Sequence, residues 1–314
     1  IMRKQTKIAA VVSAAALLAL GASMTSFAAS KGTWMMVDGE WQCYDKNGDA
    51  YTNVFCSSNG KEYYVGDDGQ LVRSEWVEYD GDQYFVNSSG AKITNDWRLT
   101  TPYDDDTADE EWYYFKSNGK KIYADNGERT KDKTINGKKY AFDEYGAMVA
   151  EWSLDEDDEK KASDTEAQEA ASTASTSEAW EGNGKYAKYT QAWKYYNSVE
   201  DGSRVSKGWF KVVPAEMLNK EKYDDDEESW YYADGSGNLY AGEFKTIKGK
   251  KYAFRNDGRM LTGLKFIKEG DEDFADVKAD DDDSRPFANE DDFFDNAIEF
   301  YEPNGYKCYY FGGG

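Results

Sequence analysis

Glycines recur along this chain at a fixed step of 21 residues, and this period constrains the fold more than any other feature of the sequence. The step separates the members of two runs, Gly48, Gly69 and Gly90, and Gly237 and Gly258. A second glycine precedes several of these by 9 residues. A fixed period of this length indicates an array of repeated units, and two glycines in each unit indicate two turns.

Short aromatic runs lie between the two turns of each unit. The run Trp112-Tyr113-Tyr114-Phe115 before Gly119 is the fullest example. Asn or Asp precedes the glycine at both turns, as in Asn59-Gly60 and Asp68-Gly69, and such pairs supply the positive φ angles of tight hairpin turns. Each unit is therefore predicted to be a β-hairpin followed by a connector.

A single hairpin of this size cannot bury its aromatic face, so successive hairpins must stack. The chain has 25 Tyr and 10 Trp but only 39% hydrophobic residues, which means that ring packing must replace a thick aliphatic core. We predict an all-β fold, an elongated β-hairpin solenoid of about 21-residue repeats with acidic loop insertions.

In two of the units that exceed this period, the excess falls at the first turn. Gly90 and Gly119 are 29 residues apart, an excess of 8, and the added residues include 104–106 and 109–111, all acidic. Trp209 and Trp230 are 21 residues apart, an excess of 14, and residues 224–228 between them are acidic. Acidic loops are therefore predicted at one edge of the solenoid.

Composition divides the chain into six segments. Arg3, Lys4 and Lys7 precede an apolar run over residues 8–20, which indicates a secretory signal peptide and is too short for a membrane span. Residues 155–177 contain no aromatic side chain, which favours a disordered linker or a loose helix. The predicted boundaries are 1–29 for the signal peptide, 30–153 for N-terminal repeats, 154–179 for the linker, 180–268 for C-terminal repeats, 269–299 for an acidic insertion and 300–314 for the start of a further, truncated repeat.

Charge and composition also exclude whole classes of function. The formal net charge of −23 repels nucleic acid and anionic lipid, so we predict neither nucleic-acid binding nor membrane insertion after signal cleavage. The chain has no histidine, which excludes Ser-His-Asp and Cys-His catalysis and His-ligated zinc. Carboxylate pairs suited to a glycosidase can always be found among 61 acidic residues, so that signal has no specificity. We predict no catalytic residue, no cofactor and no metal site, and at most weak collection of Ca²⁺ by the Asp-rich loops.

Three cysteines, Cys43, Cys56 and Cys308, are too few for a disulfide framework. Cys43 and Cys56 lie in adjacent units and could pair in an exported protein. Alternatively, Cys43 is packed at a position where other units carry an aromatic ring. The sequence favours the packed interpretation and leaves the disulfide open.

The motifs resemble the choline-binding or cell-wall-binding repeats, also called glucan-binding repeats, of secreted Gram-positive bacterial proteins. The resemblance is carried by residues 134–148, 247–263 and 111–115, and it covers nearly all of the chain outside the signal peptide, the linker and the acidic insertions. In that family the opening Trp of a repeat, the Trp that begins Trp-Tyr-Tyr and an aromatic residue of the next repeat form a ligand cage. The resemblance therefore implies binding of a quaternary ammonium by cation–π attraction, or of sugar rings by stacking.

Both cage tryptophans occur together in three units, as Trp34 with Trp41, Trp97 with Trp112, and Trp209 with Trp230. Most other aromatics are expected to hold the array together, and an exposed minority to bind. The candidate ligand-binding residues are Trp34, Trp41, Trp76, Tyr84, Trp97, Trp112, Tyr113, Trp209, Trp230 and Tyr231.

The resulting prediction is a secreted, non-catalytic protein of the Gram-positive cell wall that attaches noncovalently to choline-bearing teichoic acid or glucan. Two alternatives stay open. The chain could be the targeting module of a wall hydrolase whose catalytic domain lies beyond residue 314. It could also be a surface adhesin whose acidic loops contact a host or neighbouring surface protein.

Overall fold

A computed structural model describes residues 32–125, 127–154, 184–270, 274–279 and 287–312, with the side chains of 184–186 excepted. These residues divide between two compact units, Ile1–Tyr123 with Tyr145–Ala147, and Ala124–Glu144 with Met148–Gly314. The predicted signal peptide and nearly all of the predicted linker lie outside the described residues. The domain boundaries therefore stay a prediction.

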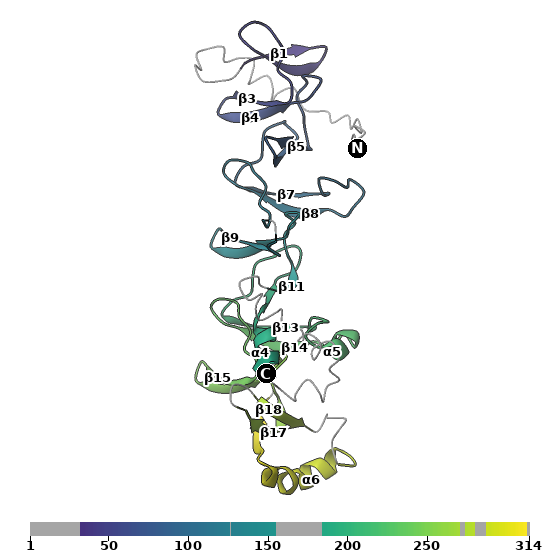
Figure 1. Ribbon diagram of the computed structural model, residues 1–314, viewed down its shortest axis with the longest axis vertical. Coiled ribbons are helices and arrows are strands. Elements are labelled where there is room, and N and C mark those ends of the chain that lie inside the picture. The colour runs from purple at the N-terminus through teal and green to yellow at the C-terminus, as the bar shows by residue number, and fades with distance from the viewer. Residues whose placement is uncertain (1–31, 126, 155–183, 271–273, 280–286, 313–314) are drawn as a thin grey trace. The chain divides into compact units, whose positions relative to one another are not determined.

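The first unit consists of antiparallel hairpins of five-residue strands, each closed by a tight turn or by an insertion (Figure 1). In chain order they are β1 (Thr33–Val37) with β2 (Glu40–Tyr44), β3 (Val54–Ser58) with β4 (Lys61–Val65), β5 (Glu75–Tyr79) with β6 (Asp82–Val86), and β7 (Asp96–Thr100) with β8 (Glu111–Phe115).

The second unit continues the same pattern and adds short helices. Its hairpins are β9 (Lys131–Ile135) with β10 (Lys138–Phe142), β11 (Glu151–Leu154) with β12 (Trp193–Tyr196), β13 (Gly208–Val212) with β14 (Ser229–Ala233), and β15 (Glu243–Ile247) with β16 (Lys250–Phe254). A three-stranded sheet has the order β18 (Phe274–Ala279), β17 (Gly263–Glu269), β19 (Lys307–Phe311). The helices are α4 (Gly184–Gln191), α5 (Lys220–Asp224), α6 (Glu290–Tyr301) and the 3-10 turn η3 (Glu302–Asn304). The predicted all-β architecture of repeated hairpins is confirmed.

The first turn of each regular hairpin has the geometry that its sequence predicts. The residue before the glycine has φ of 50° to 53° and the glycine has φ of 73° to 90° in the pairs Asp38-Gly39, Asn59-Gly60, Asp80-Gly81 and Asn136-Gly137. Positive φ at both central residues defines the type I′ turn, whose twist matches that of the two strands.

The second turn differs from the prediction. Among the described residues the glycines Gly48, Gly69 and Gly258 have positive φ, but the Asn or Asp before them does not. The Asp side chain instead accepts a backbone hydrogen bond, as Asp68 Oδ1 does from Gln70 N at 2.9 Å. The expectation of positive φ before the second glycine was therefore wrong, because an Asx turn can form without it.

A third left-handed position, which the sequence pattern did not reveal, precedes the first strand of many hairpins. Asn53, Ser74, Asn95 and Lys207 have φ of 50° or 51° there. Their amides donate to the carbonyl that follows the second strand of the same hairpin, as Ser74 N does to Asn87 O at 3.0 Å. Because the residue type varies, no motif marks this position.

Successive hairpins within a unit are joined by one recurring backbone hydrogen bond. The acceptor is the carbonyl of the second residue in the second strand of one hairpin. The donor is a backbone amide in the segment that follows the next hairpin. The pairs are Leu71 N with Trp41 O, Lys92 N with Glu62 O, Lys121 N with Gln83 O, Arg204 N with Lys139 O, and Met260 N with Trp230 O, at 2.8 or 2.9 Å. Aromatic rings fill the space between hairpins, as where Phe55 lies 5.1 to 5.4 Å from Tyr64, Tyr79 and Tyr84.

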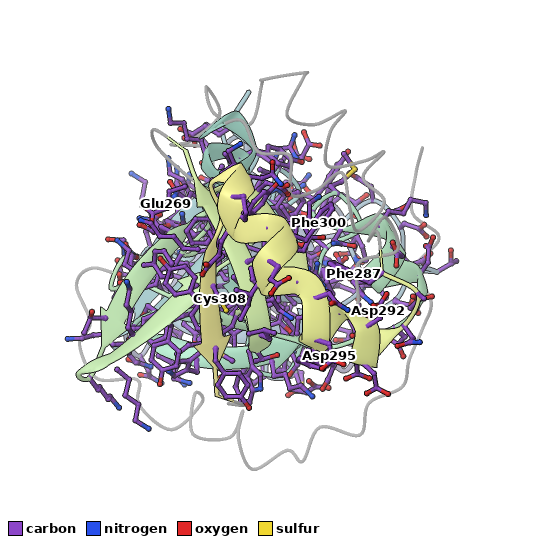
Figure 2. All side chains as sticks on the ribbon, turned by 90° about the horizontal axis from the view of Figure 1, so that it is seen from below. Glu269, Phe287, Asp292, Asp295, Phe300 and Cys308 are labelled. Atoms are coloured by element: carbon purple, nitrogen blue, oxygen red, sulfur yellow. The ribbon has the colours of Figure 1, made fainter. Side chains whose placement is uncertain are left out.

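The last hairpin consists of β17 and β19, with a large insertion at its first turn. Leu264 faces Tyr310 in the same register in which Trp97 faces Tyr114 in β7 and β8. The residues predicted to start a further repeat thus supply the closing strand of a hairpin that begins at Gly263. The acidic insertion between the strands contains β18 and α6. Phe293, Ala297 and Tyr301 of α6 pack on Phe266 of β17, and Cys308 lies against the same cluster. Figure 2 shows α6, which carries Asp292, Asp295 and Phe300, beside the strand of Cys308.

Candidate functional site

Trp97 and Trp112 form a right-angled pair on one face of the hairpin β7–β8. Trp97 is in register with Tyr114, and Trp112 precedes Tyr114 by two residues, so all three side chains point to the same face. The two indole centroids are 6.4 Å apart at an interplanar angle of 89°, and Trp97 lies 5.1 Å from Tyr114. Both tryptophans are half-buried.

Trp209 and Trp230 repeat this arrangement in the second unit, on the hairpin β13–β14. Their centroids are 6.4 Å apart at 87°, and Trp209 lies 5.0 Å from Tyr232. Trp230 is 38% exposed, whereas the ring of Trp209 is backed by Tyr252 of the next hairpin at 4.8 Å. We call Trp97-Trp112-Tyr114 the first paired-tryptophan face and Trp209-Trp230-Tyr232 the second.

Each face belongs to a module of two hairpins in which another tryptophan, Trp76 or Trp152, contacts the start of the insertion. In β5–β8, Trp76 packs edge-on against Tyr113 at 4.9 Å, and its indole Nε1 donates to Thr101 O at 2.9 Å. In β11–β14, Trp152 does the same with Tyr231 at 5.1 Å and Val213 O at 2.8 Å. Thr101 and Val213 are the first residues after β7 and β13, so each insertion begins with the same anchoring contact.

Four of the predicted ligand-binding residues are buried. Trp76, Tyr84, Tyr113 and Tyr231 are 6%, 6%, 1% and 0% exposed, and their rings lie within hydrophobic clusters. The insertions explain the burial of Trp76, because Tyr103 of the first acidic loop packs on its ring at 6.3 Å and donates to Glu78. These rings present no face to a ligand in this conformation.

The third predicted pair, Trp34 with Trp41, is placed differently from the other two. Both are half-buried and pack against the cluster of Tyr63, Leu71 and Ala91. Trp34 meets Tyr63 edge-on at 5.8 Å. In this hairpin Cys43 stands in register with Trp34, at the position that Tyr114 and Tyr232 occupy in the paired-tryptophan faces.

The two faces differ in one side chain at their rim. Leu99, in register with Trp112, is 37% exposed, and the corresponding residue in register with Trp230 is Lys211. The Lys211 ammonium lies 3.3 Å from the Glu228 carboxylate. The first face thus has an apolar rim, and the second has a rim with an ion pair. The sequence analysis did not predict this difference, which follows from the strand register.

The acidic residues 224–228 of the second insertion are exposed, but other residues of the same insertion are packed into the unit. Ala215 and Leu218 are buried against Tyr231, and the amide of buried Asn219 donates to Asp257 Oδ2 at 2.9 Å. Asp257 is fully buried and also pairs with Arg259 Nε at 2.7 Å. Burial raises the pKa of the Tyr231 hydroxyl well above its ordinary value, and the nearby Asp257 charge raises it further.

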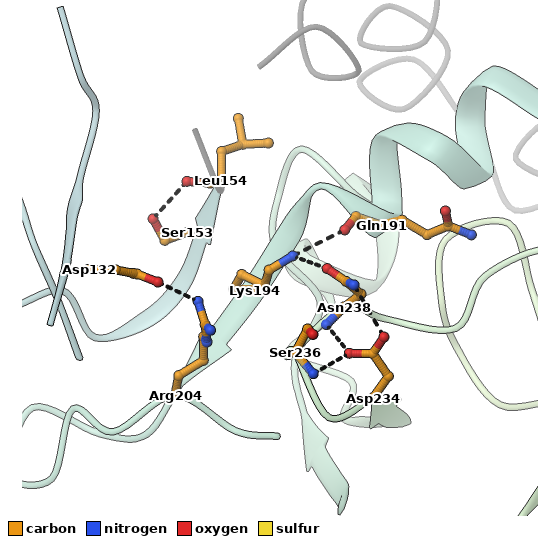
Figure 3. A network of polar contacts seen from close by, with 9 residues as sticks. All are labelled: Asp132, Ser153, Leu154, Gln191, Lys194, Arg204, Asp234, Ser236 and Asn238. Carbon is orange, nitrogen blue, oxygen red and sulfur yellow. Dashed lines mark hydrogen bonds and ion pairs between the residues drawn. The ribbon is translucent and has the colours of Figure 1, made fainter. Parts of the chain in front are cut away.

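Polar contacts also fix the start of this module in the second unit (Figure 3). The buried Lys194 ammonium of β12 donates to Asn238 Oδ1, and Asn238 is held in turn by Asp234. Arg204, 9% exposed, donates to Asp132 Oδ2 at 2.8 Å. These contacts join β12 to the turn after β14 and hairpin β9–β10 to the chain after β12.

The described residues contain no group of three side chains suited to hold a metal ion. Nor does any helix in the described ranges have the length and apolarity needed to cross a membrane.

Comparison with known proteins gives similarity without a family assignment. No family model matches the chain. It is 24% identical over 226 residues to Glucosyltransferase-S of Streptococcus mutans, a match that covers 72% of this chain and 11% of that protein.

Similar solved structures include CbpJ from Streptococcus pneumoniae, with 19% identity and a TM-score of 0.45, covering 74% of this chain and 58% of that one. Choline binding protein F from Streptococcus pneumoniae has 20% identity and a TM-score of 0.42 over the same shares of the two chains. The modular autolysin LytC from that organism, solved in complex with a synthetic peptidoglycan ligand, has 15% identity and a TM-score of 0.44, covering 78% of this chain and 47% of that one. The chain thus spans about a tenth of the curated relative and about half of these solved chains.

Proposed function

We propose that this protein attaches noncovalently to a polymer of the bacterial envelope through its two paired-tryptophan faces. The observation that supports this most is the repetition of the face itself. Two indoles at right angles and 6.4 Å apart, backed by a tyrosine, occur on equivalent strand positions of β7–β8 and β13–β14. Packing alone would not require half-exposed tryptophans at both places.

The chemistry of such a face suits two kinds of ligand. Two electron-rich indole faces that meet at a corner attract a quaternary ammonium group by about 0.5 to 2 kcal/mol per ring. The same faces also stack on the apolar side of a sugar ring. The acidic surface of the protein, with a net charge of −23, would add long-range attraction for a cation but not for a neutral glycan.

The side chains at the rims make each face better suited to one of these two ligands. The first face has the uncharged Leu99 in register with Trp112, so the residue at this position does not oppose a quaternary ammonium such as choline. The second face has the Lys211 ammonium next to Trp230, which opposes a second cation even though Glu228 balances part of its charge. A neutral glucan segment fits the second face better, and the similarity to a glucosyltransferase supports a glucan as one ligand to test.

Retention on purified Gram-positive cell walls tests the proposal directly. Choline-bearing walls and immobilised dextran are incubated with the full chain, and choline or soluble dextran is added as competitor. We expect Trp97→Ala with Trp112→Ala, and separately Trp209→Ala with Trp230→Ala, to weaken retention by about tenfold or more for a lost pair of ring contacts. Tyr145→Ala is the matched control, since Tyr145 is 66% exposed and lies outside both faces.

Loss of retention in the control as well as in the face variants would contradict the assignment to these faces. No retention of the unmodified chain on any wall or glucan would contradict the proposed function itself.

The proposal places the protein outside the cell, associated with the Gram-positive surface, and gives it no catalytic role of its own. A second candidate is that the chain is the targeting part of a larger enzyme, because it matches only 11% of the glucosyltransferase that it resembles. Sequencing the gene downstream and assaying the complete product for glycan hydrolysis or transfer distinguishes the two.

A further inference from the structure

Cys43 and Cys56 meet in the interior of the first unit, although they belong to different hairpins. Cys43 lies on β2 and Cys56 on β3, and neither side chain has exposed surface. Both belong to one small cluster with Val65, covered by Trp34 and Tyr51.

The space around the two sulfurs is closed. The Cys43 and Cys56 side chains lie in the same cluster, close enough for Cys56 to raise the pKa of the Cys43 thiol. A Cβ on Gly32 would stand 2.3 Å from Cys43 Sγ, so only glycine fits against that sulfur. The backbone next to them is fixed as well, because Tyr51 N donates to Cys43 O at 2.8 Å and thereby holds the connector between the hairpins.

We propose that Cys43 and Cys56 form a disulfide in the mature protein that joins the first hairpin covalently to the second. In the reaction a thiolate of one cysteine attacks a low-molecular-weight disulfide, and the second cysteine then displaces the bound thiol. One S–S bond forms between Cys43 and Cys56, the bond of the reagent breaks, and two equivalents of reagent thiol carry away the two electrons and two protons.

The cross-link matters most for the first hairpin, which has little other interior. Cys43 is its one fully buried side chain among the described residues of β1 and β2, while Met35 and Met36 are 44% and 56% exposed. A disulfide that closes a short loop restricts the unfolded chain and so favours the folded state.

The same surroundings determine when the disulfide can form. The interaction of the Cys43 S–H with Cys56, and then the burial of Cys43, raise the pKa of the Cys43 thiol far above its ordinary value. Since the thiolate is the attacking species, a folded and reduced chain reacts slowly. The cross-link must therefore form while the two hairpins fold, before the cluster closes over the sulfurs.

The test compares two ways of oxidising the full chain in a Cys308→Ser background, which removes the third thiol. In one arm the reduced, unfolded protein is refolded with a mixture of oxidised and reduced glutathione. In the other arm the folded, reduced protein meets the same mixture. Intact mass, alkylation of free thiols after denaturation and non-reducing peptide maps are followed with time.

We expect the refolding arm to lose the mass of two hydrogens and to yield one linked peptide pair containing Cys43 and Cys56. The folded arm should react at least about tenfold more slowly, because its thiolates are suppressed. The oxidised form should also show slower amide exchange across β1 and β2 than the reduced form. Recovery of both cysteines as free thiols, or only as mixed disulfides with glutathione, would overturn the proposal, and equal rates in the two arms would overturn the order of events.

Discussion

The indole of Trp76 donates a hydrogen bond to the backbone carbonyl of Thr101, 2.9 Å away, and so anchors the first acidic loop to the preceding hairpin. Trp152 makes the same contact with Val213 at the start of the second acidic loop. The insertions are thus parts of the two-hairpin modules rather than appendages to them. Each insertion contacts one tryptophan of its module, buried Trp76 or partly buried Trp152, and leaves the paired-tryptophan face of the next hairpin accessible.

Replacing Trp76 by phenylalanine should lower the free energy of unfolding of the first unit by about 1 to 3 kcal/mol, because the Thr101 carbonyl loses its donor. Urea unfolding followed by tryptophan fluorescence measures the change. Thr101→Val is the matched control, since the acceptor is a backbone atom and survives that substitution. A Trp76→Phe protein as stable as the unmodified chain would show that the contact contributes nothing.

Asp257 and Asp68 occupy the same second-turn position and should respond very differently to replacement by asparagine. Asp257 is buried and pairs with Arg259, whereas Asp68 is exposed and accepts only a turn hydrogen bond. Asp257→Asn should destabilise by about 3 to 5 kcal/mol, because it removes a buried negative charge that pairs with the buried Arg259 guanidinium. Asp68→Asn should change stability by less than about 0.5 kcal/mol. Thermal unfolding of the two variants side by side decides the comparison.

Alkaline pH should destabilise the second unit through Tyr231. Its pKa is raised in the folded state, chiefly by burial and then by the Asp257 charge, so the unfolded chain releases this proton at a lower pH than the folded chain. Its contribution is fully present below the unfolded pKa of about 10 and is lost as pH rises from there toward the folded pKa. The Tyr231 hydroxyl has no hydrogen-bond partner among the described residues.

Tyr231→Phe should therefore retain its stability at pH 7. Between pH 9 and pH 11 its free energy of unfolding should fall less steeply with pH than that of the unmodified chain, by the contribution of roughly one proton. Urea midpoints across that range measure the slope. An unchanged slope would contradict the assignment to Tyr231 and point to other buried tyrosines, such as Tyr189.

Glycine should be the preferred residue at the left-handed position before each first strand. Lys207 has φ of 51°, and Gly242 stands at the corresponding place of the next hairpin, with φ of 64°. Lys207→Gly should stabilise by about 1 kcal/mol through relief of the left-handed backbone. Gly242→Ala should destabilise by a similar amount, so melting temperatures that move in the same direction for both variants would contradict this.

Exchanging the rim residues should exchange ligand preference, if the proposed function holds. Leu99→Lys should weaken choline binding at the first face by about fivefold, and Lys211→Leu should strengthen it at the second, because a nearby like charge opposes a cation by about 1 kcal/mol. Titration followed by tryptophan fluorescence in variants that retain one face measures both. Dextran binding serves as the control, since a neutral glycan should be little affected by Leu99→Lys.

The sequence predicted the hairpins well because their turns are determined locally. Asn59-Gly60 and its counterparts at the first turn adopt type I′ geometry. The tryptophans of both paired-tryptophan faces were named from the resemblance to known repeats, together with the pair Trp34 and Trp41. Tyr114 and Tyr232 were missed as members of the faces, although counting two residues along the strand from Trp112 and Trp230 would have found them.

Burial was harder to predict, because it depends on segments far away in the sequence. Asp257 and Asp68 look alike in their local motifs, and only the packing of the second insertion distinguishes them. Trp76 and Trp97 likewise both open a repeat, but of these two rings it is Trp76 on which Tyr103 packs. The helix α6 gave no signal in a segment interpreted as an acidic insertion.

The first turn between paired strands tolerates additions of very different size. It is a two-residue turn in β5–β6, a ten-residue loop in β7–β8, and in β17–β19 it contains a strand and a helix, yet the strand register is the same. The pairing of the strands therefore does not depend on the length of their connection. The turn at Asp80-Gly81 is accordingly suited to the insertion of a foreign segment. A foreign epitope or enzyme spliced there would be displayed from a hairpin ladder that keeps its own alignment.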